Sequence, residues 1–405
     1  MAEDRWKSQA WWKLPVYTGD VSGVCSALYE LGGMVIMHDP SGCNSTFNTH
    51  DEIRWTQRES LIFLSGLTQM DAITGNDTKL IDDTVSAAQA YAPAFIAIAN
   101  SPVPWLIGTD FHAICAKIME RTRIPAFHVE TNAMHDYTRG AGLAFFNLAR
   151  MLFSKRTSEE APANGKPAGR TSCGAARNPD SGIGKKAYRP VRVNILGMTP
   201  LDFTRKGEPD RLRKRLEAEG FEVVSVWAMN DRLENLKNAL SAEVNLVVSS
   251  TGIYAARWME ERFGIPYTAG IPAGGFADVL FRSVRQCAAQ GESCVPYAGI
   301  LAQNALERKA ACGAGCFAGE PVMMGSLAAA RILEEGENCD LIPLTETVRG
   351  LIPEDTVCPK GEEQIRRVLG GYDRVTADPM LREACRDGCR FEELPHFALS
   401  GRMFL

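Results

Sequence analysis

The sequence predicts an α/β protein of three units, each with a parallel, doubly wound sheet, and three observations support this prediction. Residues 19–155 alternate between helical periodicity and short apolar runs, as strands covered by helices do. A second series of the same kind begins at Val191, and a shorter third series begins near Cys312. Residues 156–188 are rich in Gly, Pro, Ala and Ser and show no periodicity, which is typical of a linker or a long surface loop.

The 405 residues are enough for two or three domains, each with its own core. We therefore expect an N-terminal domain over residues 1–155, the linker or loop over 156–188, a second domain over 189–310 and a third, shortened domain over 311–405. The polar N-terminal stretch contains Trp6, Trp11 and Trp12, so we expect it to be an arm that packs on another surface, such as a partner subunit.

The elements of each unit follow from its apolar pattern. In the first unit we expect strands at 34–37, 94–99 and 124–130, with helices near 20–32, 56–65, 78–91, 110–121 and 139–153. In the second we expect strands at 191–197, 221–227 and 244–250, a loop over 264–275, and helices near 207–219, 231–239, 252–263, 274–289 and 298–309. In the third we expect strands before Glu320, at 340–346 and at 372–379, helices over 321–335 and 361–369, and a terminal helix.

Charge and hydropathy exclude several classes of function. The net charge of −5 argues against a nucleic-acid partner. No apolar run is long enough to span a membrane, and no secretory signal is visible, so we expect a cytoplasmic protein. No phosphate-binding loop of the G-x-x-x-x-G-K-[ST] type occurs, so we do not expect ATP hydrolysis by that route.

The most informative stretch is the sequence HDPSGC, which ends on Cys43. Pro40 and Gly42 bracket Ser41, so the backbone turns sharply and brings the thiol to the carboxyl end of the strand over 34–37. Ligands of open α/β sheets bind at that end. A single cysteine is also compatible with a small buried hydrophobic residue. His38 and His50 flank the loop and are candidates for proton transfer or for supporting a ligand.

The twelve cysteines are many for a cytoplasmic chain, in which disulfides are not the default explanation. Iron–sulfur chemistry and buried thiols both fit this count. Cys312 and Cys316, and likewise Cys385 and Cys389, are four residues apart. On a helix each pair would share a face and could contact one metal, although simple packing is the alternative that we favour.

Six segments, in the same order, resemble the nitrogenase component 1 superfamily, and together they span nearly the whole chain. They are HDPSGC, MDAITGNDTKL, AFIAIANSPVPWLIGTD, ARWMEERFGIPY, GEPVMMGSLAAARIL and LPHFALSGRMF. The resemblance implies three Rossmann-like domains and a homologous partner subunit, in a heterodimer or heterotetramer. It also implies an iron–sulfur cluster at the subunit interface, electrons from an ATP-hydrolysing iron protein, and reduction of a small-molecule substrate.

The resemblance assigns roles to particular residues. Cys43 matches a cluster-ligand cysteine, while Ser101 stands where the three-cysteine subunits have another, and the remaining position falls near Tyr17. The chain thus resembles the one-cysteine partner type, as in the second subunits of the cofactor scaffold and of protochlorophyllide reductase. Cys43 would supply one ligand to a [4Fe–4S] cluster, which normally has four. His38 and Asp39 would support it through hydrogen bonds.

Other interpretations stay open at this stage. Cys25 is a weaker candidate ligand, since it lies about two helical turns from the expected position, and a homodimer using Cys43 and Cys25 is possible. Val248 stands where the family's cofactor-bearing subunit has a cysteine ligand, so nitrogen fixation in that manner is disfavoured. The chain could also be a scaffold subunit for assembly of a complex metal cofactor, or a structural paralogue without a cluster.

Overall fold

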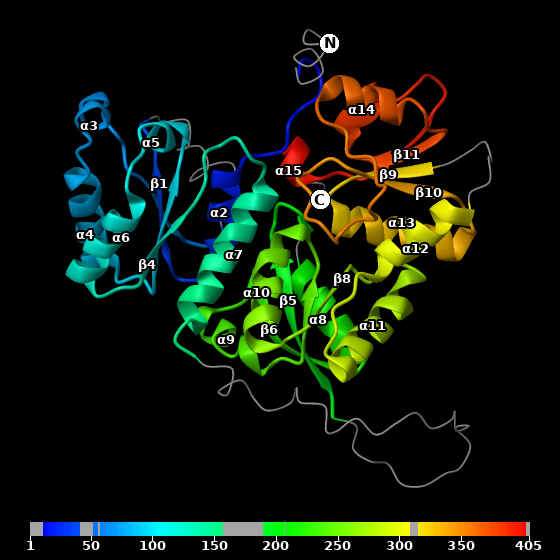
Figure 1. Ribbon diagram of the computed structural model, residues 1–405, viewed down its shortest axis with the longest axis horizontal. Coiled ribbons are helices and arrows are strands. Elements are labelled where there is room, and N and C mark those ends of the chain that lie inside the picture. The colour runs from blue at the N-terminus through cyan, green and yellow to red at the C-terminus, as the bar shows by residue number, and fades with distance from the viewer. Residues whose placement is uncertain are drawn as a thin grey trace.

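The computed structural model describes residues 11–40, 52–55, 57–156, 189–205, 207–307 and 315–401. These residues form three four-stranded parallel sheets with helices packed around them (Figure 1). The predicted α/β fold with three parallel sheets is therefore confirmed. Cys43, Cys312 and the expected linker from residue 157 to 188 lie outside the described residues.

The first sheet has the strand order β2-β1-β3-β4. Its strands are β1 (Met34–His38), β2 (Leu61–Leu64), β3 (Ile96–Asn100) and β4 (Ala126–Val129). Its helices are α2 (Asp20–Leu28), α3 (Gln69–Thr74), α4 (Thr78–Tyr91), α5 (Pro102–Leu106), α6 (Phe111–Thr122) and α7 (Tyr137–Phe153). The helix expected near 56–65 was wrong. The four consecutive apolar residues Leu61–Leu64 fit a strand as well as a helix. The parallel pairing of Leu61 with Met34 shows that they form a strand.

The second sheet has the order β6-β5-β7-β8. Its strands are β5 (Val191–Met198), β6 (Phe221–Ala228), β7 (Val244–Val247) and β8 (Tyr267–Ala269). Its helices are α8 (Glu208–Ala218), α9 (Leu233–Leu236), α10 (Ile253–Phe263), α11 (Phe276–Gln290) and α12 (Pro296–Glu307), with 3₁₀ turns η2 (Ala239–Ser241) and η3 (Ser250–Gly252). The loop expected over 264–275 contains strand β8. The sequence did not indicate this strand, because only three residues pair with β7 and they give no periodic signal.

The third sheet has the order β10-β9-β11-β12. Its strands are β9 (Gly315–Gly319), β10 (Cys339–Pro343), β11 (Arg374–Ala377) and β12 (Arg390–Glu393). Its helices are α13 (Pro321–Glu335), α14 (Glu362–Leu369) and α15 (Phe397–Ser400), with the 3₁₀ helix η4 (Pro379–Ala384). After residue 379 we expected a terminal helix, whereas the structure has η4, then β12 and then the short helix α15. Gly388, at φ 82°, turns the chain so that Arg390 pairs with Arg374.

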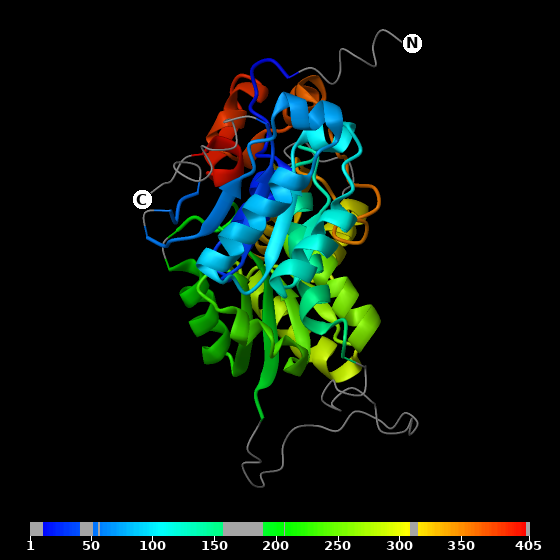
Figure 2. The same cartoon turned by 90° about the vertical axis from the view of Figure 1, so that its left-hand side faces the viewer.

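Helix α7 connects the first and second units (Figures 1 and 2). On one side it crosses α2 so closely that a Cβ on Gly140 would lie 1.9 Å from the carbonyl oxygen of Asp20. On the other side Phe145 packs against Trp227 of β6, with ring centroids 6.0 Å apart. Helix α7 is therefore a shared wall of two units, and it brings Tyr137 to the place where all three units meet.

The beginning of the described chain packs on the third unit rather than projecting outward. The backbone N–H groups of Trp12, Lys13 and Leu14 donate to Oε2 of Glu362, at 2.6, 2.6 and 3.1 Å. Burial alone would raise the pKa of Glu362, but these three hydrogen bonds lower it to about 2. The N-terminal arm thus packs on α14 of its own chain.

Among the described helices, none has the length and apolar character needed to cross a membrane.

Candidate functional site

The carboxyl edge of the first sheet brings together three of the residues singled out in the sequence. His38 ends β1 and pairs in register with Asn100, the last residue of β3. The backbone N–H of Ser101 donates to the carbonyl oxygen of His38 at 3.1 Å. His38, Asp39 and Ser101 therefore lie side by side where the segment that contains Cys43 leaves the sheet.

His38 is held as a buried, neutral imidazole. Its Nδ1 lies 2.8 Å from Oγ of Ser65, and its ring meets Phe111 edge-on with centroids 5.9 Å apart. Burial lowers the pKa of His38 to about 4, so the ring carries no charge at neutral pH. Ser65 also accepts a hydrogen bond from the backbone N–H of Asp39 at 3.2 Å. One serine thus orients both predicted supporting residues.

Ser101 has an unused hydroxyl. Its side chain is buried, and its Oγ has no hydrogen-bond partner among the described residues. A buried hydroxyl without a partner costs about 1–3 kcal/mol. The Ser101 hydroxyl is therefore available for a hydrogen bond with a group outside the described residues.

Both ends of the segment that carries Cys43 are fixed. At its start, the carbonyl oxygen of Asp39 accepts a hydrogen bond from the N–H of Leu67 at 3.0 Å. At its end, the buried guanidinium of Arg54 donates hydrogen bonds to the Glu52 carboxylate at 2.6 Å and to the carbonyl oxygen of Ser26 on α2 at 2.7 Å. The sheet and α2 thus determine where this segment begins and ends.

Cys25 lies elsewhere, in the core face of α2. Its side chain is fully buried among apolar neighbours. Burial, and then the charge of Glu52, raises the pKa of this thiol. A thiol in this environment is a poor source of thiolate, which is the form that binds iron.

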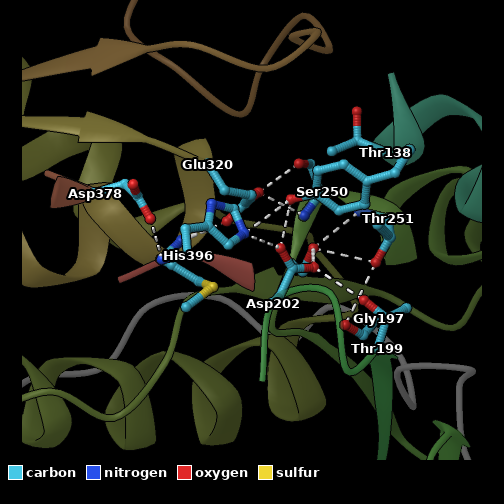
Figure 3. A network of polar contacts seen from close by, with 12 residues as sticks. Thr138, Gly197, Thr199, Asp202, Ser250, Thr251, Glu320, Asp378 and His396 are labelled. Carbon is cyan, nitrogen blue, oxygen red and sulfur yellow. Dashed lines mark hydrogen bonds and ion pairs between the residues drawn. The ribbon is translucent and has the colours of Figure 1, made fainter. Parts of the chain in front are cut away.

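A second polar cluster lies where the three units meet, and the sequence analysis did not anticipate it. Asp202, which follows β5, is at its centre (Figure 3). Tyr137 and Ser249 donate hydrogen bonds to its two carboxylate oxygens, at 2.5 and 2.6 Å. Nε2 of His396 lies 3.0 Å from Oδ1 of the same carboxylate. We call this group, together with Glu320 and Ser250, the junction cluster.

Glu320, which follows β9, is the second carboxylate of the junction cluster. It accepts hydrogen bonds from the N–H groups of Ser250 and Met323, both at 2.8 Å, and from the Ser250 hydroxyl. Burial, and then the nearby Asp202, raises the pKa of Glu320 to about 7. Near neutral pH this carboxyl group can therefore hold or release a proton.

His396 completes the cluster from the end of the third unit. Its backbone N–H donates to Asp378 at 2.7 Å, whereas its ring Nδ1 is buried and finds no hydrogen-bond partner within the described ranges. The ring of Tyr17 packs edge-on against the imidazole, with centroids 5.3 Å apart. Each of Asp202, Glu320 and His396 follows a strand, so position after a strand was the one signal that could have indicated them.

A cavity of about 890 Å³ lies beside Tyr17, between the first and third units. It is lined by the start of α2 and by residues 133–136, 343–347 and 358–361. His135 and Glu346 bridge the two units at 2.7 Å on its wall. The volume suits a small organic molecule, and Tyr17 separates that space from His396.

The remaining expectations concern single positions. Val248, directly after β7, is fully buried. Cys385 and Cys389 are half-buried near Cys316, but they flank a turn and do not share a helix face. Within the described ranges, no group of three or more His, Cys, Asp or Glu side chains could hold a metal ion.

Comparisons with known proteins agree with this architecture. The model of the family described as nitrogenase component 1 type oxidoreductase matches residues 22–289. The nitrogenase iron-molybdenum cofactor biosynthesis protein NifE of Methanosarcina barkeri is 24% identical over 239 residues, covering 57% of this chain and 46% of that protein. One subunit of the light-independent protochlorophyllide reductase of Chlamydomonas applanata is 22% identical over 251 residues, covering 59% of this chain and 58% of that subunit.

The chain thus spans about half the length of these curated relatives. A solved structure described as nitrogenase Cp1 at pH 5 is similar over 96% of this chain and 85% of that chain, with a TM-score of 0.57 and 16% identity. At that identity, the likeness shows a shared fold.

Proposed function

Because the chain belongs to the family of nitrogenase component 1 type oxidoreductases, we propose that it is one subunit of a nitrogenase-like reductase. In this proposal Cys43 supplies one thiolate to a [4Fe–4S] cluster, and a homologous partner subunit supplies the remaining ligands. An ATP-hydrolysing iron protein provides the electrons. A small-molecule substrate occupies the cavity beside Tyr17.

The observation that carries this proposal is the unpartnered Oγ of Ser101, buried at the edge from which the segment with Cys43 departs. The residues present fit a cluster there. Cys43 would hold it, and the Ser101 hydroxyl would face it as a hydrogen-bond donor. The hydrogen bond between Nδ1 of His38 and Ser65 would hold the imidazole in place beside the segment with Cys43. The cluster itself would supply one-electron transfer.

A one-ligand role also agrees with the donor set of the described residues. They contain no group of three or more candidate metal ligands, so the other thiolates would come from the partner. We leave Cys25 out of the ligand set, because it is buried in the core of the first unit and its pKa is raised. The alternative homodimer would use Cys43 and Cys25 of both copies, so leaving Cys25 out disfavours it.

A second candidate function is a scaffold on which a metal cofactor is assembled. The similarity to NifE, a cofactor biosynthesis protein by name, favours it. Both functions use the same Cys43 site. Turnover separates them, because a reductase reduces substrate repeatedly, whereas a scaffold passes its cluster to a recipient protein.

The test is to purify the chain with its homologous partner under anaerobic conditions and to measure iron, acid-labile sulfide and the low-temperature EPR signal. About four irons per pair are expected in the wild type, and Cys43→Ala should lose or alter the signal. Cys358→Ala is the matched control for the iron and EPR measurements alone, since Cys358 is an exposed thiol of the third unit that also lines the cavity beside Tyr17. A well-folded pair that binds no iron even after reconstitution would overturn the proposal and leave a cluster-free structural paralogue.

If the cluster is present, the pair is then incubated with the iron protein, ATP and candidate substrates. Multiple turnovers per pair support the reductase. Transfer of the cluster to an apo-protein without turnover supports the scaffold instead.

A further inference from the structure

A second cavity, of about 630 Å³, follows the outer edge of β4 between α6 and α7. Strand β4 is the last strand of the first sheet, and residues 124–128 all line the cavity. A neighbouring hollow of about 520 Å³ shares five lining residues with it, Phe111, His112, His128, Asn147 and Arg150. The two hollows are therefore neighbours that share a wall, and we refer to them together as the edge cavity.

The floor of the larger hollow is apolar. Phe127 of β4 and Met151 of α7 are half-buried in its lining. Met119 of α6, which also lines the hollow, is 39% exposed. This surface can accept an aromatic ring or an alkyl chain.

The rim of the same hollow is basic. Arg123, Arg150 and Lys155 line it, and no Asp or Glu residue does. Within the described part of the chain, no ion pair joins any of these three cations to a carboxylate, although Arg150 does lie over the ring of Phe146 at 5.5 Å. The two acids beside the smaller hollow are Asp110, which caps α6, and Glu130.

His128 fixes the boundary between the two hollows without adding charge. Its Nε2 lies 2.7 Å from Oδ1 of Asn100, and its ring stacks on Phe111 with centroids 4.1 Å apart. Burial, and then the neighbouring His112, lowers the pKa of His128 to about 4. The positive charge of the edge cavity at neutral pH thus comes from its arginine and lysine side chains.

We propose that the edge cavity binds an amphipathic organic anion, whose carboxylate or sulfonate pairs with Arg150 and whose aromatic or alkyl body lies on Phe127, Met119 and Met151. A planar guanidinium is well suited to bind such an anionic group. The volume lies in the range of small-molecule sites. This binding does not depend on the iron–sulfur proposal, since Cys43 takes no part in it.

The test uses anilinonaphthalene sulfonate as the probe, titrated into the full chain while its fluorescence is measured, followed by displacement with octanoate. Saturable binding that octanoate reverses is expected. Arg150→Ala should weaken it by at least about tenfold, because a charge-assisted contact is lost. Met119→Asp, at an exposed position, should weaken it as well by placing a negative charge on the apolar wall.

Arg121→Ala is the matched control. Arg121 lies on α6, the helix that carries Met119, and Arg121→Ala removes the same charge as Arg150→Ala does on α7. Arg121 pairs with Asp82, however, and does not line the cavity. Its affinity should equal that of the wild type. The proposal would be overturned if binding were not saturable or if octanoate did not displace the dye. It would also be overturned if Arg150→Ala and Met119→Asp, with thermal unfolding like that of the wild type, bound the dye as tightly as the wild type does.

Discussion

Nε2 of His396 lies 3.0 Å from Oδ1 of Asp202, although 194 residues separate them in the chain. Asp202 follows the first strand of the second sheet, and His396 follows the last strand of the third. Tyr137, at the start of α7, reaches the same oxygen from the first unit. One carboxylate thus joins all three units, and the junction cluster is where their relative positions are determined.

Asp202→Asn should destabilise the chain substantially. The change removes the charge that accepts hydrogen bonds from Tyr137 and Ser249 and that faces His396, all within a buried site. We expect the free energy of unfolding to fall by about 3 kcal/mol, measured by urea denaturation. Asp210→Asn, at an exposed position on α8, is the control and should change little. Equal midpoints for both variants would contradict this role of Asp202.

Glu320 should make stability depend on pH near neutrality. Its pKa is raised from 4.5 to about 7, so the folded state retains this proton to higher pH than the unfolded state does. The resulting stabilisation is complete below the unfolded value and is lost as the pH rises through about 7. Glu320→Gln cannot ionise, so the difference in unfolding free energy between this variant and the wild type should shift in favour of the variant over that interval.

The measurement for Glu320 is urea unfolding of both proteins from about pH 5 to about pH 8. Taking the difference removes the contributions of groups that do not interact with Glu320, which are the same in both proteins. A difference that stays constant across this interval would show that Glu320 does not titrate there.

Gly140→Ala should be strongly destabilising. The new Cβ would lie 1.9 Å from the carbonyl oxygen of Asp20, so α7 and α2 would have to separate. We expect a loss of about 3 kcal/mol or more in unfolding free energy. Gly299→Ala is the matched control, because Gly299 is also helical, in α12, and has open space at its Cβ. That control should be neutral or stabilising by up to about 1 kcal/mol.

Glu362→Gln should release the N-terminal arm. Because the pKa of Glu362 is lowered, its carboxylate stabilises the folded chain fully above the ordinary pKa of 4.5. This stabilisation is lost as the pH falls through about 2. At neutral pH the substitution removes the charge to which three backbone N–H groups donate. Cleavage by trypsin after Lys13, followed by mass spectrometry, should be faster in this variant.

Glu363→Gln is the control for the arm, since Glu363 is next in the chain but pairs with Arg367 on the exposed side of α14. Its rate of cleavage after Lys13 should match that of the wild type. Equal rates in the Glu362 and Glu363 variants would contradict the anchoring role of Glu362.

The sequence predicted those features that depend on local pattern. Parallel strands end at one edge, so the sites after β1 and β3, with Asp39 and Ser101, were predictable neighbours. Helix α13, over Pro321–Glu335, was also predicted with its bounds, because Pro321 and Gly336 mark its ends. Strand β2 was missed, since Leu61–Leu64 is apolar throughout and gives no period.

The junction cluster could not be predicted in this way. Asp202, Glu320 and His396 each follow a strand, but their meeting depends on how whole sheets pack against one another. The raised pKa of Glu320 is likewise a product of burial between units. Neither effect leaves a periodic or spaced signal in the chain.

The fixed ends of the segment from Asp39 to Glu52 have a consequence for how such proteins can diversify. Ser65 and Leu67 hold one described end and Ser26 holds the other, and all three residues lie outside the segment. Changes of residue within the segment can therefore leave these described contacts, the strand register and the helix packing intact.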